Sequence, residues 1–244
     1  DLNGFSDTVG ALTLLGGDIT TGAGTLTMNN NLTATYRGVG DTARILGNLA
    51  LGASTRTFTV TNTPGLGAAD LFVLAAVSGT GGIIKTGDGL MVLSASNSFS
   101  GAVTVNDGDL DLQDDFAAGT TSGGVTVNGD ATLRLFGNIH IGAEALTLNS
   151  TATSGTLNSR IVSNSWAGPV TLSANTIVTV SAGDALNLLG PISGPGGLTK
   201  IGSGTLYYSG DTANTYVGVT TVNQGTLVLA KSFVNGAMIN NLVI

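Results

Sequence analysis

The stretch GGLTKIGSGTLYYS at residues 196–209 decides the fold, because a related version of it occurs earlier in the same chain. The earlier version, GGIIKTGDGLMVLS, occupies residues 81–94. Each version is followed by a second related stretch, GAVTVNDGDLDL at residues 101–112 and GVTTVNQGTLVL at residues 218–229. Internal repetition on this scale indicates an architecture built from stacked repeats.

Short strands are the local structure that these stretches predict. In GTLYYS, Leu206 and Tyr208 fall on one face of an extended chain. Thr205 and Tyr207 fall on the other face, and a period of two with one apolar side is typical of a strand that buries one face. Gly, Asn and Asp separate the segments and supply the tight turns. The chain contains roughly 27 such segments, about one every nine residues.

The composition describes a folded chain with an almost uncharged surface. Hydrophobic residues make up 42% of the 244 residues and charged residues only 9%, whereas disordered chains combine low hydrophobicity with high charge. The net charge is −7 and the eight Lys and Arg residues are dispersed, which argues against nucleic acid as a partner. Cysteine is absent, which excludes disulfides and thiolate metal sites. No run of 18 apolar residues occurs, so we expect no membrane span.

We predict an all-β fold, a right-handed parallel β-helix (β-solenoid) with about three short strands per coil. The strand-and-turn pattern recurs with Leu and Val in phase, which favours stacked coils over an antiparallel sandwich. At three strands per coil, the segments make about nine to eleven coils. We expect residues 1–244 to form one continuous β-helix, with internal units at about 1–115 and 116–231. Residues 232–244 are then expected to start a further coil.

The repeated stretches resemble a known repeat. Residues 191–230, with GGLTK, the GTLYYSG core and the tail NTYVGVTTVNQGTLVL, closely resemble the autotransporter-associated β-strand repeat (passenger-associated repeat) of bacterial secreted and surface proteins. Residues 77–112 carry the same pattern, but Leu90 replaces the Thr and the segment 97–100, Asn-Ser-Phe-Ser, replaces Asn-Thr-Tyr. The resemblance implies a β-helical passenger that is exported across the outer membrane and displayed or released. It does not imply one ligand or one reaction.

The densest acidic cluster is Asp107, Asp109, Asp111, Asp114 and Asp115. Spacing by two places the first three on one strand face, opposite Leu110 and Leu112. Ca²⁺ is usually bound by oxygens of a curved loop, and the GGxGxD core of calcium-binding β-rolls does not occur in the chain. The pattern therefore favours a solvated outer face over a cation site.

No set of residues predicts an enzyme or a cofactor site. His140 is the only histidine and is expected to point outward between Ile139 and Ile141. Arg134 is expected to point outward, and no acid–base pair, phosphate-binding loop or nucleophile elbow accompanies either residue. We therefore predict no catalytic residue, no cofactor and no metal ligand.

Aromatic and basic side chains complete the candidates for a binding face. Among the aromatic residues, Tyr207 is the one expected to face outward, Tyr208 belongs in the core, and Trp166 is expected to cover a turn. This is a weak basis for a glycan platform, which needs a row of exposed aromatic rings. Lys85 and Lys200 recur in the repeat, and we expect both to face away from their apolar neighbours as solubilising charges.

The prediction for function is a non-catalytic structural module of an extracellular bacterial fibre, stalk or surface-displayed passenger. We expect open β-helix ends to stack on neighbouring repeats of the same chain or on identical copies joined head to tail. The alternative is an adhesin that binds glycans or other surfaces along the β-helix face. In both cases the expected location is extracellular or at the cell surface.

Overall fold

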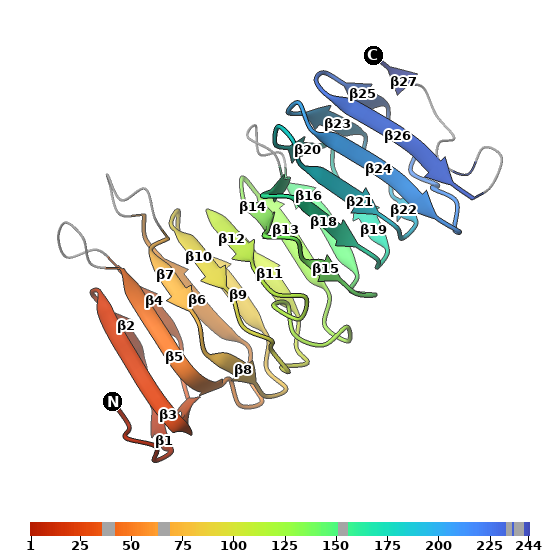
Figure 1. The fold of residues 1–244 in the computed structure, drawn as a ribbon. Helices are drawn as coiled ribbons and strands as arrows, with labels where there is room; N and C mark the ends of the chain where they lie inside the picture. Colours follow the sequence, from red (N-terminus) through yellow and green to blue (C-terminus); the bar gives the residue numbers. More distant parts are fainter. Residues whose placement is uncertain (36–41, 63–68, 151–155, 233–235, 237–241) are drawn as a thin grey trace. The chain divides into compact units, whose positions relative to one another are not determined.

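A computed structural model describes residues 1–35, 42–62, 69–150, 156–232, 236 and 242–244. These residues contain 27 β-strands and no helix, and so no helix that could span a membrane (Figure 1). The strands pair in parallel and stack as a β-solenoid of about 10 turns, which confirms the predicted fold class. The chain divides into two compact units, Asp1–Gly123 and Gly124–Ile244.

The first unit contains two main parallel sheets. One sheet has the order β1-β3-β5-β7-β10-β12, and the other has the order β2-β4-β6-β9-β11. The strands of this unit are β1 (Asp7–Val9), β2 (Leu12–Leu14), β3 (Gly17–Met28), β4 (Leu32–Ala34), β5 (Ala43–Ala50), β6 (Arg56–Val60), β7 (Leu71–Val73), β8 (Ala76–Ser78), β9 (Ile83–Thr86), β10 (Leu90–Leu93), β11 (Val103–Val105) and β12 (Asp109–Leu112). The short β8 pairs with the end of β5 and adds a third side to the coil.

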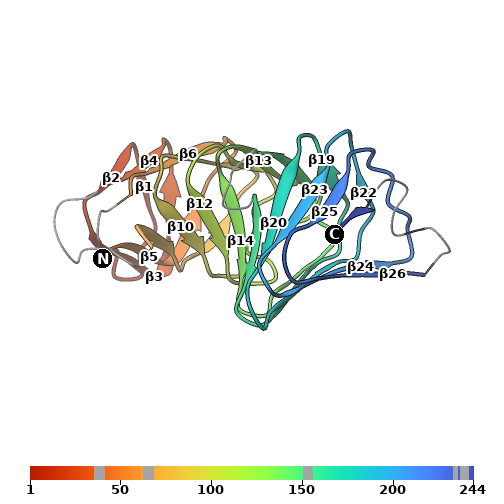
Figure 2. The ribbon, with the colours of Figure 1, turned by 90° about the horizontal axis from the view of Figure 1, so that it is seen from above.

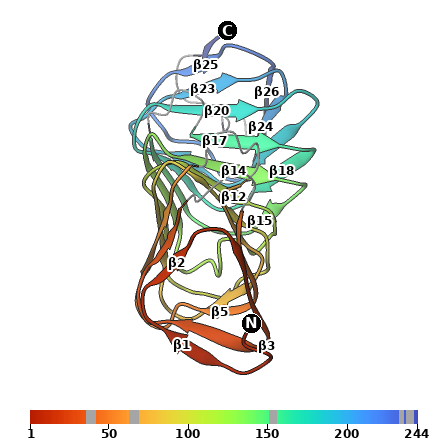
Figure 3. The ribbon, with the colours of Figure 1, turned by 90° about the vertical axis from the view of Figure 1, so that its left-hand side faces the viewer.

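The second unit contains three parallel sheets. Their orders are β14-β17-β20-β23-β25-β27, β13-β16-β19-β22 and β15-β18-β21-β24-β26. The strands are β13 (Val125–Gly129), β14 (Thr132–Phe136), β15 (His140–Ile141), β16 (Leu146–Ser150), β17 (Leu157–Arg160), β18 (Ser163–Trp166), β19 (Val170–Leu172), β20 (Thr176–Val180), β21 (Ala185–Leu188), β22 (Ile192–Ser193), β23 (Leu198–Ile201), β24 (Thr205–Gly210), β25 (Thr220–Val222), β26 (Thr226–Lys231) and β27 (Leu242–Val243). Figure 3 shows the strands β14, β17, β20, β23 and β25 stacked one above another. Most of residues 232–244, where a further coil was expected, lies outside the described residues.

The core is a set of aliphatic columns that run along the stack. Leu186 pairs with Leu206 in the neighbouring strand, and Leu206 in turn pairs with Leu227. Leu186 and Leu206 are fully buried, whereas Leu227 is half-buried because β26 is the edge strand of its sheet among the described residues. Full burial of such a side chain stabilises the fold by about 1.5–3 kcal/mol.

Glycine allows the coils to approach closely at the turns that follow the lysine-bearing strands. Gly87 and Gly202 have φ angles of 77° and 75°, a conformation that side chains with a Cβ rarely adopt. A Cβ at Gly87 would collide with the carbonyl oxygen of Val60, and one at Gly202 would collide with that of Val180. Close stacking of the coils therefore requires a glycine at this position, two residues after each lysine.

The repeated sequence pattern changes sheet within the second unit. The stretch 124–135, GVTVNGDATLRL, forms β13 and β14, whereas the related stretch 218–229 forms β25 and β26. The first strand of the pattern joins the β13-β16-β19-β22 sheet in one case and the β14-β17-β20-β23-β25-β27 sheet in the other. Between these two copies, the first strand of the pattern has therefore moved from one side of the coil to another.

Trp166 corrects one detail of the sequence analysis. It was expected to cover a turn, but it is the last residue of β18 and is fully buried. Its indole Nε1–H donates to the backbone oxygen of Glu144 at 2.6 Å, so the polar edge of the ring is satisfied inside the core. The sequence did not predict this strand, because the Ser-Asn-Ser before Trp166 shows no alternation of apolar and polar residues.

Candidate functional site

The most specific side-chain site of the first unit is a buried ammonium group. Lys85 is fully buried, and its Nζ donates to the carbonyl oxygens of Thr86 at 3.2 Å, Gly87 at 2.6 Å and Asp107 at 2.9 Å. The first two oxygens belong to the last residue of β9 and to the turn after it, and the third belongs to the turn after β11 in the next coil. Three donors of an ammonium group match three acceptors, so the lysine fastens two successive turns together.

Lys200 makes the same arrangement in the second unit. It is fully buried, and its Nζ donates to the carbonyl oxygens of Ile201 at 2.9 Å, Gly202 at 2.5 Å and Gln224 at 3.1 Å. We call each such set, the lysine with its three carbonyl oxygens, a lysine clamp. The expectation that Lys85 and Lys200 face solvent as solubilising charges is therefore wrong. Turn carbonyls supply what water would otherwise supply to the buried charge.

The electrostatic surroundings of the two clamps differ. Burial lowers the pKa of Lys85 from its usual 10.5 to about 8, and the nearby carboxylates of four aspartates partly oppose that shift. These are Asp107, Asp109, Asp88 and Asp70. Burial also lowers the pKa of Lys200, where no carboxylate contributes to the shift. The first clamp therefore lies among carboxylates that interact with its lysine, whereas no carboxylate shifts the pKa of the lysine in the second clamp.

The acidic cluster predicted from sequence lies beside the first clamp. Asp107 is exposed and lies in a turn, Asp109 is half-buried, and Asp111 is only 5% exposed within β12. The expectation of a uniformly solvated outer face is wrong for Asp111, because its neighbours on adjacent strands cover it. The described residues contain no group of three His, Cys, Asp or Glu side chains that could hold a metal ion.

Both repeats also bury an asparagine that binds backbone groups. The Asn97 Oδ1 accepts from the Val77 N–H at 2.8 Å, and its Nδ2 donates to the Ala117 oxygen at 2.7 Å. In the second repeat, the Asn214 Oδ1 accepts from the Ile192 N–H at 2.9 Å. These asparagines replace regular strand pairing on their side of the coil and were not identified as structural from sequence.

The cores of the two repeats differ by hydroxyl groups. The first repeat places Leu93, Phe99 and Val103 in the core, and all three are fully buried. The corresponding residues of the second repeat are Tyr208, Tyr216 and Thr220, which are also fully buried. The Tyr208 and Tyr216 rings meet edge to face with centroids 6.5 Å apart, and the Tyr216 hydroxyl is hydrogen-bonded to the Thr220 hydroxyl. Burial raises the pKa of Tyr208 well above its usual value.

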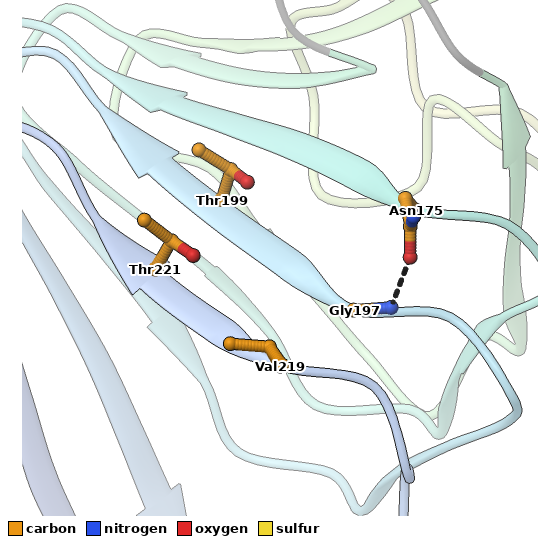
Figure 4. A pocket seen from close by; sticks show the side chains of 5 residues that line it. All are labelled: Asn175, Gly197, Thr199, Val219 and Thr221. Carbon is orange, nitrogen blue, oxygen red and sulfur yellow. Dashed lines mark hydrogen bonds between the residues drawn. The ribbon is translucent and has the colours of Figure 1, made fainter. Parts of the chain in front are cut away.

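A shallow hollow of about 220 Å³ lies on the outer face of the second unit, over β23 and β25. Figure 4 shows how its lining side chains come from three successive coils. The lining consists of Asn175, Gly197, Thr199, Val219 and Thr221. The Asn175 Oδ1 accepts from the Gly197 N–H at 2.9 Å, which fixes the amide at one end of the hollow. The lining carries no charged group.

The other residues considered from sequence do not assemble into a site. His140 is exposed between the buried Ile139 and Ile141, as predicted, and its Nδ1 lies 2.9 Å from the Ser165 hydroxyl. Tyr207 is half-exposed and faces outward, as predicted. Arg134 is half-buried on the outer face of β14.

Comparison with known proteins identifies the segments that carry the clamps. The passenger-associated transport repeat matches residues 83–112 and 198–229, which contain Lys85 and Lys200. We call the two matched segments the transport repeats, after the family model to which they are similar. The lysine clamp is common to both transport repeats.

A relative of the chain is also an autotransporter protein. Over 213 residues, 87% of the chain, the sequence is 30% identical to the adhesin BmaC autotransporter of Brucella suis biovar 1 (strain 1330). The chain spans 5% of the length of that protein. No solved structure matches the chain. The transport repeats and the relative place the chain at the cell surface or outside the cell.

Proposed function

We propose that the chain is a non-catalytic β-solenoid segment of a surface-displayed autotransporter passenger, and that it acts as a spacer within an adhesin. The lysine clamps carry this proposal. They place the most specific polar chemistry of both transport repeats inside the stack, where it holds coil to coil and reaches no external ligand. The chain's partners are then neighbouring repeats or identical copies stacked head to tail.

The second candidate function is direct adhesion along the outer face. The hollow over β23 and β25 supports it, because the Thr199 and Thr221 side chains project there on adjacent strands in register. Hydroxyl and methyl groups without a charge suit a neutral glycan better than an acidic one.

A display experiment separates the two functions. A small antigen-binding domain is fused to the chain and displayed on bacteria, with the same domain displayed alone as the control. A spacer increases the capture of antigen-coated particles, because it holds the domain farther from the cell. With the domain blocked by soluble antigen, cells that display the chain bind glycan-coated and host-cell surfaces at background level. Strong binding by blocked cells would favour the adhesive face and contradict the spacer.

A further inference from the structure

Apolar burial alone does not fix the register of the two coils that a lysine clamp joins. The inner side chains of β11 are Val103 and Val105, both fully buried, and they pair with Ile83 and Lys85 of β9. A slip of one residue would turn the inner side chains outward, but a slip of two residues keeps the same faces inside and outside. Because β11 reads Val-Thr-Val, such a slip would still place a valine against β9. A further determinant of register is therefore required.

The first lysine clamp responds to the register directly. Lys85 pairs with Val105 in the next coil. Its ammonium group binds the carbonyl oxygen that lies two residues after each of them, in Gly87 and in Asp107. The clamp therefore bridges equivalent positions of two neighbouring coils, and both acceptors are within reach only when the two strands are in register.

The second clamp keeps this geometry although its coil is longer. Lys200 pairs with Val222, and Figure 2 shows their strands β23 and β25 side by side in one sheet. The acceptors are again two residues after each, in Gly202 and Gln224. The acceptor in the next coil lies 22 residues from the lysine in the first clamp and 24 residues from it in the second. The register at the clamp is therefore constant, whereas the length of the coil is not.

A slip of two residues would break either clamp. Two residues of a strand span about 6.6 Å, so the slip moves the Asp107 or Gln224 oxygen out of hydrogen-bond range. The ammonium group would then remain buried with one acceptor fewer, which is unfavourable for a charge. The clamp therefore distinguishes two pairings that apolar burial treats alike.

A glycine in the next coil excludes the same slip by steric collision. A Cβ at Gly108 would lie 2.5 Å from the Gly87 oxygen. A Cβ at Gly225 would lie 2.5 Å from the Gly202 oxygen. A slip of two residues in either direction would bring an asparagine or a leucine to these positions, from residues 106, 110, 223 and 227. Attraction at the lysine and repulsion at the glycine thus favour one register.

We propose that the lysine clamps are register locks, which decide which residues of successive coils pair. Without the lysine, apolar burial accommodates both the native pairing and a pairing slipped by two residues. Buried polar groups specify register in coiled coils in this way, at a cost in stability. The proposal goes beyond the spacer role and does not depend on it, because it concerns how coils pair and not what the passenger does.

Disulfide trapping tests the lock, because the chain contains no cysteine. Thr199 and Thr221 are paired on the outer face of β23 and β25 (Figure 4), so Thr199→Cys with Thr221→Cys reports the native register. The two slipped registers are reported by Ile201→Cys with Thr221→Cys and by Thr199→Cys with Asn223→Cys. The Cα atoms of a slipped pair lie about 8 Å apart in the native register, beyond the reach of a disulfide, and about 5 Å apart after the slip.

Each cysteine pair is refolded from urea under mild oxidation, in the full chain with and without Lys200→Met. With Lys200 present, the native pair is expected to close and both slipped pairs to stay reduced. With Lys200→Met, the closed fraction of at least one slipped pair is expected to rise about tenfold. Leu198→Ala, at another buried inner position of β23, is the matched control for lost stability and should leave the slipped pairs reduced. An unchanged slipped fraction in Lys200→Met, or an equal rise in Leu198→Ala, overturns the proposal.

The first repeat provides the same test where a variant of the second does not refold. Ile84→Cys with Thr104→Cys reports the native register. The two slipped registers are reported by Thr86→Cys with Thr104→Cys and by Ile84→Cys with Asn106→Cys. Lys85→Met is expected to raise the closed fraction of a slipped pair, and Ile83→Ala is its control at a buried inner position. Slipped pairs that stay reduced in folded Lys85→Met overturn the proposal.

Discussion

The two transport repeats keep the same clamp in different surroundings. Lys85 and Lys200 each bind three turn carbonyls across two coils, with N···O distances between 2.5 and 3.2 Å. Around the first clamp stand four aspartates, and the second has none that affects its lysine. The core of the second repeat uses two tyrosines and a threonine in place of the leucine, phenylalanine and valine of the first. The comparison teaches that the turn chemistry of the repeat is fixed, whereas its core and surface can be exchanged.

The largest expected effect comes from charging the core that the two repeats share. Leu206→Asp in the second repeat and Met91→Asp in the first place a carboxylate at a fully buried position. Each is expected to lower the free energy of unfolding by about 4 kcal/mol, measured by urea denaturation. Thr205→Asp, on the half-exposed neighbouring position, is the control and should cost less than about 1 kcal/mol. Equal losses at Leu206 and Thr205 would contradict the assignment of the inner face.

Removal of either clamp is expected to be the next largest effect. Lys85→Met and Lys200→Met keep the length of the side chain but leave three turn carbonyls without their donor. We expect each to lower the free energy of unfolding by about 3 kcal/mol, because charge-assisted hydrogen bonds are lost in a buried site. Lys→Met at an exposed solubilising lysine would be nearly neutral, so a change within about 0.5 kcal/mol would contradict the clamp.

The burial of Lys85 in the first clamp predicts a pH dependence of stability. The pKa of Lys85 in the folded chain, about 8, lies below its usual 10.5. Between these values the unfolded chain binds more protons, so the free energy of unfolding rises with pH, by up to about 1.4 kcal/mol per pH unit. Urea denaturation at several pH values should show this rise in the wild type and a smaller one in Lys85→Met. Identical slopes would mean that Lys85 does not titrate in this range.

The hydroxyl groups of the second core give the smallest predicted effect. Tyr216→Phe leaves the Thr220 hydroxyl without its partner in the core and should cost about 1 kcal/mol. The double variant Tyr216→Phe and Thr220→Val reproduces Phe99 and Val103 of the first repeat, and it should recover most of that loss. Thermal melts of the two single variants and the double variant measure the coupling. Additive losses would show that the two hydroxyls act independently.

The fold was predictable because its pattern is local and repeated. The alternation of Leu206 and Tyr208 with Thr205 and Tyr207 identified the buried face of β24 correctly. Glycine and asparagine at the turns then separated one strand from the next. The strand β18 was missed, since Ser163, Asn164 and Ser165 carry no apolar alternation. It forms because the Asn164 side chain satisfies backbone groups inside the coil.

The inward position of both clamp lysines also follows from the alternation of the sequence. Both were nevertheless expected to face outward, because lysine carries a charge. Lys85 is two residues after Ile83, and Lys200 is two residues after Leu198, so alternation places both lysines on the inner face. A lysine at such a position is normally read as an exposed residue. The carbonyls that bind its ammonium group come partly from the next coil, about twenty residues later, which no local pattern reveals. The positive φ angles of Ile161 and Val162, 58° and 68°, were equally out of reach, because the Asp184 carboxylate that accepts from both N–H groups lies in the following coil.

The change of sheet by the repeated pattern in the second unit has a consequence for display. The related strands β14 and β26 lie in different sheets because the distance between them is not a whole number of coils. The stretches 196–209 and 218–229 occupy the same two sheets, so within this transport repeat equivalent positions stack in one direction. The stretch 124–135 occupies a different pair of sheets, so the same positions of the pattern face another side of the second unit. Where the pattern starts along the coil therefore decides which side of the solenoid displays a given position.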